Sequence, residues 1–204
     1  MNDPHEGVLH FGAAREIFCT SWTRTKEESI PLWKMYSGLA GIRIELPSDL
    51  FKKEGSESSS IDEIRLKNLS PNLPYSIDKV IGPICVEYGG VLESNSNDCI
   101  FDGKAIDLVK MKHHHWSYEE EVRFICYPHS KQGVSFILSD KFSQDRSHQL
   151  DERFIDIPYR DSVLEKMNIT IGPHFCQGQR IILELLLNTY APCSKIFESK
   201  VRIK

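Results

Sequence analysis

Hydrophobic and polar residues alternate along several short segments with the period of two that is typical of β-strands. In residues 42–46, isoleucine and leucine alternate with arginine and glutamate, and Pro47 ends the pattern. Other segments are rich in β-branched and aromatic residues, which also favour strands. Strands are therefore predicted at residues 16–22, 42–46, 80–88, 121–127, 133–138, 153–157, 169–171 and 196–203.

A helical period predicts four further elements. In residues 26–36 an acidic pair precedes an apolar group, Pro31 is placed to occupy a first helical turn, and Gly38 and Gly41 end the pattern. The strongest helix is expected at 177–190, where one apolar face is formed by Ile181, Ile182, Leu185 and Leu186. A weak amphipathic helix at 94–112 and a short helix at 163–168 are also predicted.

Strands and helices follow one another without regular strand–helix–strand units. This order predicts an α+β fold, with a mixed, largely antiparallel central sheet flanked by helices. With 204 residues the chain has the length of one domain, so we expect residues 1–204 to form a single domain. Residues 52–76 are rich in serine and proline and predict a polar surface insertion.

Charge and hydropathy exclude some functional classes. Twenty-five Lys and Arg residues against 29 Asp and Glu give a net charge of -4, so no domain-wide positive field exists to bind duplex nucleic acid. The longest apolar run, 181–187, is interrupted by Glu184 and is far shorter than the ~20 residues that cross a bilayer. Residues 1–6 lack the features of a secretory signal. We therefore expect a cytoplasmic protein without a membrane partner.

The six cysteines contain no Cys-x-x-Cys pair, which argues against a zinc ribbon or a dithiol redox site. Cys85 and Cys126 lie inside apolar segments, where a thiol behaves as a small hydrophobic group. We expect most of the cysteines to be reduced and buried.

The densest polar cluster of the sequence is at residues 112–123. In an extended chain Glu119, Glu121 and Arg123 share one face, because successive side chains alternate across a sheet. Two carboxylates and a guanidinium there would hold sugar hydroxyls and stabilise a developing cation. The alternative is that Arg123 pairs with both glutamates on a solvated face, which stabilises a fold by only about 0.2–1 kcal/mol.

Three consecutive histidines, His113, His114 and His115, belong to the same cluster. Imidazole is a common ligand of zinc and iron, but consecutive side chains diverge in both helices and strands. We therefore expect a basic loop and no metal. A metal-dependent hydrolase that uses His113 or His115 with Glu119 stays as an alternative.

Trp33 and Tyr36 are three residues apart on the first predicted helix and therefore share a face. They are candidates for the walls of a ligand pocket, with core packing as the alternative. Ser21 has no surrounding Gly-x-Ser-x-Gly motif, so we expect a positioning hydroxyl rather than a nucleophile. Gly172-Pro173 lacks the flanking residues of a phosphate-binding loop and predicts a turn.

Taken together, these segments resemble the bacterial domain-of-unknown-function 2971 family over nearly the whole chain. The Trp33–Tyr36 and Glu119–Arg123 blocks are the specific ones. Family members carry a further strand and helix ahead of residues 2–6, so the resemblance implies a shortened form, a sequence with a late start or a protein that has lost catalysis. The matching positions are 2–6, 18–21, 32–36, 41–44, 169–173 and 196–203, with Lys112, Trp116, Glu119, Glu121, Arg123 and Ser199.

The layout of that family is similar to that of ADP-ribosyltransferase-like toxins. The resemblance implies an enzyme that uses NAD in a toxin or phage-defence role, with Glu121 stabilising an oxocarbenium-like transition state. Glu119 would engage the acceptor and Arg123 would complete the catalytic set, while Trp33, Tyr36 and Ser21 would contact NAD. A small nucleotide is the implied partner, and a protein and a nucleic acid stay open as acceptors. The rival hypothesis is a non-catalytic ligand-binding or regulatory module, in which the Glu119/Arg123 pair is structural.

Overall fold

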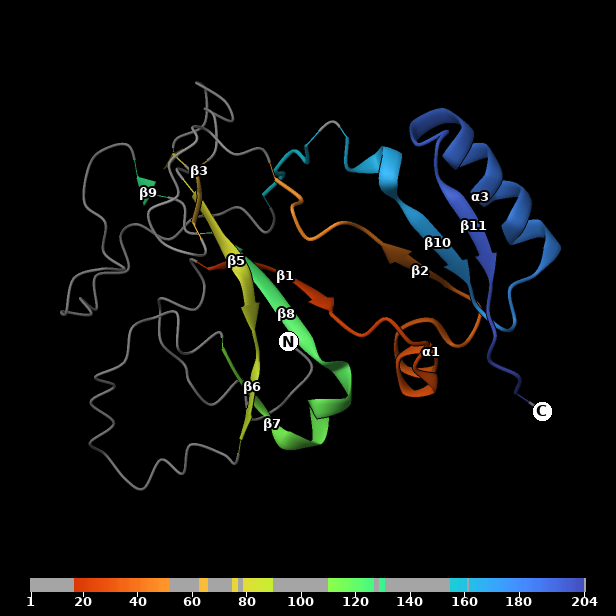
Figure 1. The fold of residues 1–204 in the computed structure, drawn as a ribbon, viewed down its shortest axis with the longest axis horizontal. Coiled ribbons are helices and arrows are strands. Elements are labelled where there is room, and N and C mark those ends of the chain that lie inside the picture. Colours follow the sequence, from red (N-terminus) through yellow and green to blue (C-terminus); the bar gives the residue numbers. More distant parts are fainter. Residues whose placement is uncertain are drawn as a thin grey trace. The chain divides into compact units, whose positions relative to one another are not determined.

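The computed structural model describes residues 17–51, 63–65, 75–76, 79–89, 110–126, 129–130, 155–160 and 162–203. The chain divides into two compact units (Figure 1). Unit 1 comprises residues 1–24 and 52–157, and unit 2 comprises residues 25–51 and 158–204. Helices and largely antiparallel strands confirm the predicted α+β class. A single domain over residues 1–204 stays a prediction.

Unit 1 contains a four-stranded antiparallel sheet. Its strand order is β1 (Phe18–Thr23), β8 (Glu121–Cys126), β5 (Lys79–Cys85) and β3 (Glu63–Arg65). Strand β8 lies between β1 and β5, and five of its six residues are buried. The strand predicted at 121–127 is therefore confirmed over 121–126.

The register between β5 and β8 shifts between Ile81 and Ile84. Gly82 lies at this irregularity with a φ of +144°, a value that L side chains rarely adopt. A Cβ atom on Gly82 would also lie 2.7 Å from the carbonyl oxygen of Arg123. Glycine is therefore required for β5 to approach β8 here. The apolar contacts of this sheet centre on Ile84 and Ile125.

The segment before β8 brings several polar residues to one end of the sheet. Strand β6 (Glu87–Gly89) pairs in parallel with β7 (Met111–His113), which leads directly into the 3-10 helix η3 (His114–Glu119). Glu120 then adopts the left-handed conformation and the chain enters β8. A further two-stranded pair in unit 1 joins β4 (Tyr75–Ser76) and β9 (His129–Ser130).

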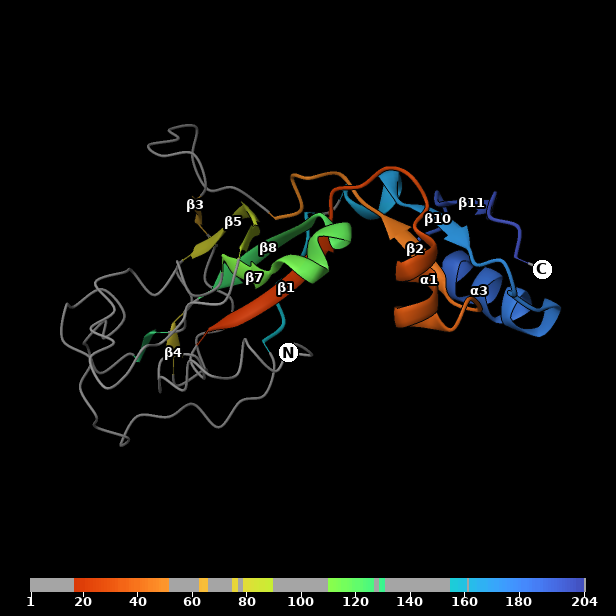
Figure 2. The same cartoon turned by 90° about the horizontal axis from the view of Figure 1, so that it is seen from below.

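Unit 2 contains a mixed three-stranded sheet. Strand β10 (Asn168–Ile171) pairs in parallel with β11 (Lys195–Glu198) and antiparallel with β2 (Ile42–Glu45). Figure 2 shows the helices α1 (Ile30–Ser37) and α3 (Gln177–Tyr190) on the same face of this sheet. A short 3-10 helix, η4 (Leu164–Lys166), precedes β10, and the core of the unit contains Met167, Ile169, Ile171, Leu183 and Ala191.

Local signals set both ends of α1. The Ser29 hydroxyl accepts a hydrogen bond from the Leu32 N–H at 3.4 Å, Pro31 occupies the first turn, and Gly38 ends the helix with a φ of +56°. The predicted start at residue 26 was too early, because the Ser29 cap lies after it. The prediction that Pro31 begins a helix and Gly38 ends one is confirmed.

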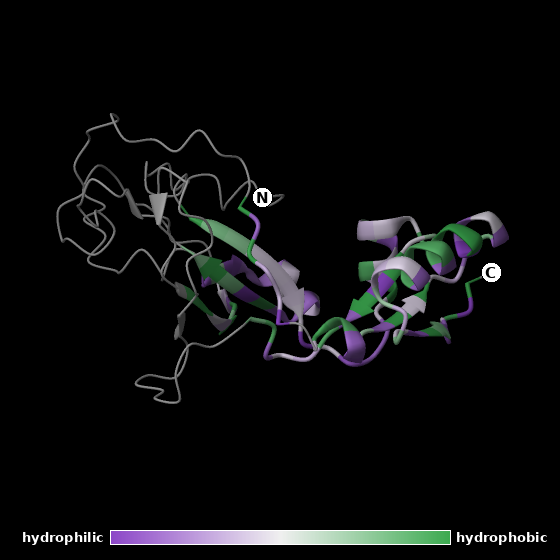
Figure 3. Ribbon diagram, turned by 90° about the horizontal axis from the view of Figure 1, so that it is seen from above, coloured by the Kyte–Doolittle hydropathy of each residue, from purple (hydrophilic) through white to green (hydrophobic). Residues whose placement is uncertain are grey.

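Helix α3 has the predicted bounds, but its predicted apolar face is exposed. Ile181, Ile182, Leu185 and Leu186 are 51–63 % exposed, whereas Leu183 is 7 % exposed and packs in the core. Apolar residues lie on more than one side of this helix (Figure 3), and β10 packs against the side that carries Leu183. Periodicity identified the helix and did not select the buried face.

Several other predicted elements differ from those observed. The predicted strand 80–88 is two strands, because β5 ends at Cys85 and Glu87 begins β6. The backbone N–H of Glu87 donates to the carbonyl of Lys110, next to β7. Residues 155–157 form no strand, the last strand ends at Glu198, and β2 joins a sheet other than that of β1, β5 and β8. The predicted strand at 133–138 and most of 52–76 lie outside the described residues; within 52–76, β3 pairs with β5. Residues 94–109 of the predicted helix 94–112 also lie outside them, and its last residues were wrongly predicted, because 111 and 112 belong to strand β7.

The cysteine prediction is correct for one residue and wrong for others. Cys126 is buried, and burial raises the pKa of its thiol to about 12. Cys85, Cys19, Cys176 and Cys193 are exposed. Alternation along β5 explains the outcome for Cys85, because Ile84 takes the buried side.

The longest described helix, α3, has 14 residues. Within the described parts of the chain, no helix has the length and apolar character needed to cross a bilayer.

Candidate functional site

Four charged side chains meet in unit 1 and are called here the charged cluster: Lys112, Glu119, Glu121 and Arg123. Glu119, Glu121 and Arg123 are only 5–6 % exposed, and the Lys112 side chain is 11 % exposed. Charged residues are seldom buried unless they are paired. Three buried charges and a partly buried Lys112 therefore form a polar cluster among the described residues of unit 1.

Three elements supply these side chains. Lys112 comes from β7, Glu119 is the last residue of η3, and Glu121 and Arg123 share one face of β8. The extended-chain interpretation of Glu119 is therefore wrong, because this residue is helical. It still meets Glu121, because the left-handed conformation of Glu120 (φ +43°) reverses the chain between them.

The hydrogen bonds of the charged cluster are short and directional. The Lys112 ammonium donates to Glu119 Oε2 at 2.6 Å and to Glu121 Oε2 at 3.0 Å. Arg123 donates to Glu121 through Nε at 2.8 Å and through Nη2 at 3.0 Å, a bidentate ion pair. The two carboxylates therefore converge on one ammonium group, while the guanidinium binds both oxygens of Glu121.

These contacts shift two pKa values in opposite directions. Burial alone would raise the pKa of Glu121, but hydrogen bonds from Arg123 and Ser21 and the Arg123 charge lower it to about 2. Burial alone would lower the pKa of Lys112, but its bonds to Glu119 and Glu121 raise it. Glu121 is therefore held as a carboxylate and Lys112 as an ammonium at neutral pH.

The alternative of an Arg123 ion pair on a solvated face is wrong, because Glu121 and Arg123 are buried. Arg123 does pair with Glu121, but the pair is withdrawn from solvent, and Glu119 binds Lys112. An exposed pair of this type contributes less than about 1 kcal/mol, whereas removing one partner of a buried pair destabilises a protein by about 3–5 kcal/mol.

Two participants were missed by the sequence analysis as site residues. Lys112 was noted only as part of a motif, and Tyr88 was not noted at all. The Tyr88 hydroxyl accepts the backbone N–H of Glu121 at 2.7 Å, and burial raises the pKa of this phenol. No local pattern signals these contacts, because they depend on the pairing of β6 with β7.

An aromatic ring borders the charged cluster. The Lys112 ammonium lies 5.1 Å from the centroid of the Trp116 ring, within the range of a cation–π contact. Tyr118 lies next to this ring, with centroids 6.2 Å apart. Trp116 is only partly buried, so the cluster has an aromatic neighbour with an accessible surface.

Of the three residues predicted to contact NAD, Ser21 belongs to unit 1, which also contains the carboxylates. Ser21 lies opposite Arg123 in the β1–β8 register, and its hydroxyl hydrogen-bonds Glu121, as a positioning group would. Trp33 and Tyr36 belong to unit 2. Tyr36 is 62 % exposed, and Trp33 is buried. Their role as pocket walls stays a prediction.

Trp33 takes part in a polar network of unit 2. Glu28 accepts hydrogen bonds from Trp33 Nε1 at 3.0 Å, from Ser199 Oγ at 2.5 Å and from the Lys200 N–H at 2.7 Å. Burial opposes ionisation of Glu28, but these bonds hold its pKa below the ordinary value. The network ties the segment before α1 to the segment after β11, which is a structural role.

No family model, curated protein or solved structure matches this chain. The resemblance to the domain-of-unknown-function 2971 family therefore stays a prediction. The charged cluster is the observation from which a function is inferred below.

The expectation that three adjacent histidines diverge is wrong. The imidazoles of His113, His114 and His115 lie with ring centroids 4.1–4.4 Å apart. The first ends β7 and the other two begin η3, so the chain changes conformation between them. The divergence rule holds within one regular element and does not hold across this junction.

Proposed function

We propose that the charged cluster is the catalytic centre of an ADP-ribosyltransferase-like enzyme that uses NAD. In this reaction the bond between the ribose and the nicotinamide nitrogen breaks, and nicotinamide leaves with the bonding electrons. The ribose carbon becomes positively charged until a nucleophile of the acceptor, or water, adds to it. Glu121 stabilises that charge, and Glu119 receives the proton of the incoming nucleophile.

The observation that carries this proposal is the convergence of two buried carboxylates on one cation. Lys112 Nζ lies 2.6 Å from Glu119 and 3.0 Å from Glu121, so this position already binds a unit positive charge. Carboxylates that are fixed in place before the reaction stabilise a developing cation without reorganisation, and burial strengthens the interaction. The lowered pKa of Glu121, about 2, keeps its carboxylate ionised.

Lys112 has a defined part in this proposal. Its ammonium lies between the carboxylates and must withdraw when the sugar enters, which its flexible stem allows. Arg123 and Ser21 hold Glu121 meanwhile. Trp116, beside the ammonium, offers a face on which a flat heterocycle can stack.

We further propose that the protein is cytoplasmic and acts in a toxin or phage-defence role. NAD is the small nucleotide, and a protein or a nucleic acid is the acceptor.

The test is nicotinamide release from NAD by the full chain, with cell lysate as a source of acceptors. The wild type and Glu120→Gln should release nicotinamide, and Glu121→Gln should not. Glu120 is the matched control because it is the neighbouring carboxylate and its ion pair with Arg24 is exposed. Glu121→Asp, which keeps the charge and withdraws it by one methylene, should retain the fold and lose most turnover. Release by folded Glu121→Asp at the wild-type rate would contradict the proposal.

One observation favours a second candidate, a non-catalytic ligand-binding or regulatory module. Lys112 and Arg123 balance Glu119 and Glu121, and a balanced buried network can serve the fold alone. This candidate predicts no nicotinamide release by the wild type and a loss of stability in Glu121→Gln. Measuring release and unfolding on the same samples separates the two.

A further inference from the structure

We propose that His113, His114 and His115, called here the histidine triad, bind one divalent transition-metal ion through their imidazole nitrogens. One potential ligand atom from each residue lies within 4.8 Å of those of the other two. This site is separate from the proposed NAD chemistry, because none of the three residues belongs to the charged cluster.

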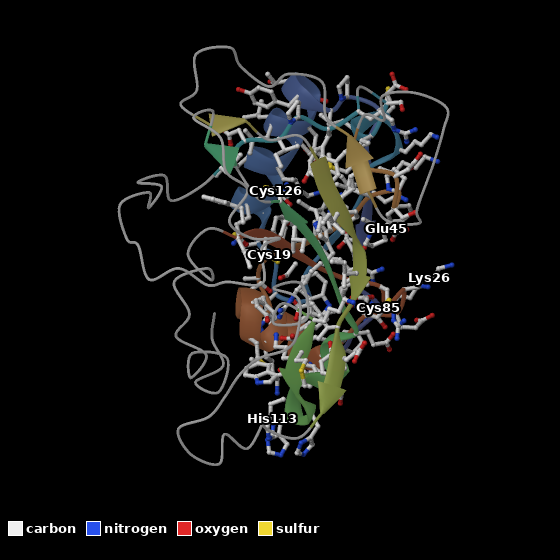
Figure 4. All side chains as sticks on the ribbon, turned by 90° about the vertical axis from the view of Figure 1, so that its left-hand side faces the viewer. Cys19, Lys26, Glu45, Cys85, His113 and Cys126 are labelled. Carbon is white, nitrogen blue, oxygen red and sulfur yellow. The ribbon has the colours of Figure 1, made fainter. Side chains whose placement is uncertain are left out.

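Backbone conformation brings the three rings together. His113 is extended (φ −62°, ψ 143°) at the end of β7, and η3 begins at His114. The turn at this junction points consecutive side chains into one region. Figure 4 shows the labelled His113 at the end of the strands of unit 1, and the neighbouring His114 and His115 are exposed.

The separation of the ligand atoms is close to that of a metal site. Bond lengths of 2.0–2.1 Å at tetrahedral angles place neighbouring ligand nitrogens about 3.4 Å apart. From separations of no more than 4.8 Å, the ligand atoms have to approach by at most about 1.4 Å. His114 and His115 are exposed, so rotation of their side chains meets little resistance.

His113 is the oriented member of the triad. It is half-buried, and its Nδ1 accepts the backbone N–H of His115 at 3.4 Å. This hydrogen bond is long and therefore weak, so exchanging it for a metal bond loses little. It also holds the first ring beside the turn that presents the other two.

The ligand set defines the class of metal. Three neutral imidazoles suit Zn²⁺, Co²⁺, Ni²⁺ and Cu²⁺, whereas Mg²⁺ and Ca²⁺ require oxygen ligands. Three protein ligands leave a coordination position for water or another small ligand. Glu119, which a hydrolase of the type considered above would use, is bound by Lys112 at 2.6 Å, so the proposal concerns the three histidines alone.

The test is calorimetric titration of the full chain with ZnCl₂, together with visible absorption of the Co²⁺ complex. The wild type should bind one ion at the triad, and the single variants His113→Asn, His114→Asn and His115→Asn should each weaken binding at least tenfold, the effect that even loss of an outer partner has. His174→Asn is the matched control, because His174 is an exposed histidine of unit 2 and its loss should not change affinity.

Thermal unfolding of each variant without metal provides a folding control, and asparagine at 113 retains a capping side chain for η3. Equal Zn²⁺ affinity in the wild type and the His114→Asn/His115→Asn double variant would overturn the proposal. So would a thiolate-to-cobalt absorption band, which would assign the metal to cysteines.

Discussion

Glu121 shows how much a single residue depends on its partners. Its carboxylate receives hydrogen bonds from Arg123, Lys112 and Ser21, and its N–H is bound by the Tyr88 hydroxyl. These partners come from β8, β7, β1 and β6. A change at this one position therefore acts on four strands.

Replacing Glu121 with glutamine should destabilise the protein by about 3–5 kcal/mol, because it leaves the charge of Arg123 buried and only partly compensated. Glu120→Gln should change stability by less than about 1 kcal/mol, since the Arg24–Glu120 pair is solvated. Urea unfolding of both variants at neutral pH measures the difference. Equal losses of stability in the two variants would show that the buried Glu121–Arg123 pair contributes no more than the exposed Arg24–Glu120 pair.

Acid should weaken the fold through the same residue. Below the ordinary glutamate pKa of about 4.3, the unfolded chain takes up a proton at position 121, whereas the folded chain does so only near pH 2. The unfolded state then binds more protons, so the contribution of Glu121 is present above about pH 4.3 and is lost as the pH falls toward 2.

The difference in unfolding free energy between wild type and Glu121→Gln isolates this contribution, because Glu28 titrates in both proteins. We expect that difference to shrink steadily between pH 5 and pH 2.5. A difference independent of pH over this interval would contradict the assigned pKa shift.

Among the elements, the contact between β5 and β8 depends on one glycine. Gly82→Ala should lower the stability of unit 1, because the added Cβ meets the Arg123 carbonyl at 2.7 Å and φ is +144°. Gly89→Ala is the matched control in β6, since nothing lies within 4 Å of its Cβ position. Chemical unfolding of both should show a loss of at least about 1 kcal/mol for Gly82→Ala alone.

Helix α3 provides a second comparison of elements. Leu183→Ala should destabilise unit 2 by about 2–5 kcal/mol, because it opens a cavity beside Ile169 and Ile171. Leu185→Ala should change stability by less than about 1 kcal/mol, since that side chain is 63 % exposed. Denaturant midpoints measure both, and an equally large loss at Leu185 would mean that this face is covered in solution.

Elements were easiest to predict where the signal is local. The cap Ser29, Pro31 and the left-handed Gly38 lie within one short segment and define α1 almost by themselves. Strand 80–88 was predicted as one element and is two, because Glu87 pairs with Met111 of β7 and donates its N–H to the carbonyl of Lys110, whereas β5 pairs with β8. The periodicity of the sequence indicates whether a segment is a helix or a strand. The point at which a strand is interrupted depends on the strands with which it pairs.

At the scale of the whole molecule, α+β was correctly predicted and the assignment of strands to sheets was not. Strand β2 alternates as clearly as β1 does, but it pairs with β10 in unit 2, whereas β1 pairs with β8 in unit 1. Alternation identified β2 as a strand, but Ile42 and Ile44 are 38 % and 44 % exposed, and the pattern carries no information on which strand lies beside it.

By itself, the sequence determined the bounds of α3, the end of α1 at Gly38 and the strand character of 42–45 and 121–126, since these depend on neighbours in the chain. It also placed Glu119, Glu121 and Arg123 in one candidate site. Only the tertiary structure decided that Lys112 lies between the two carboxylates, that Tyr88 supports Glu121 and that three adjacent imidazoles meet. Those contacts arise from the parallel pairing of β6 with β7 and from the junction of β7 with η3, which no local period encodes.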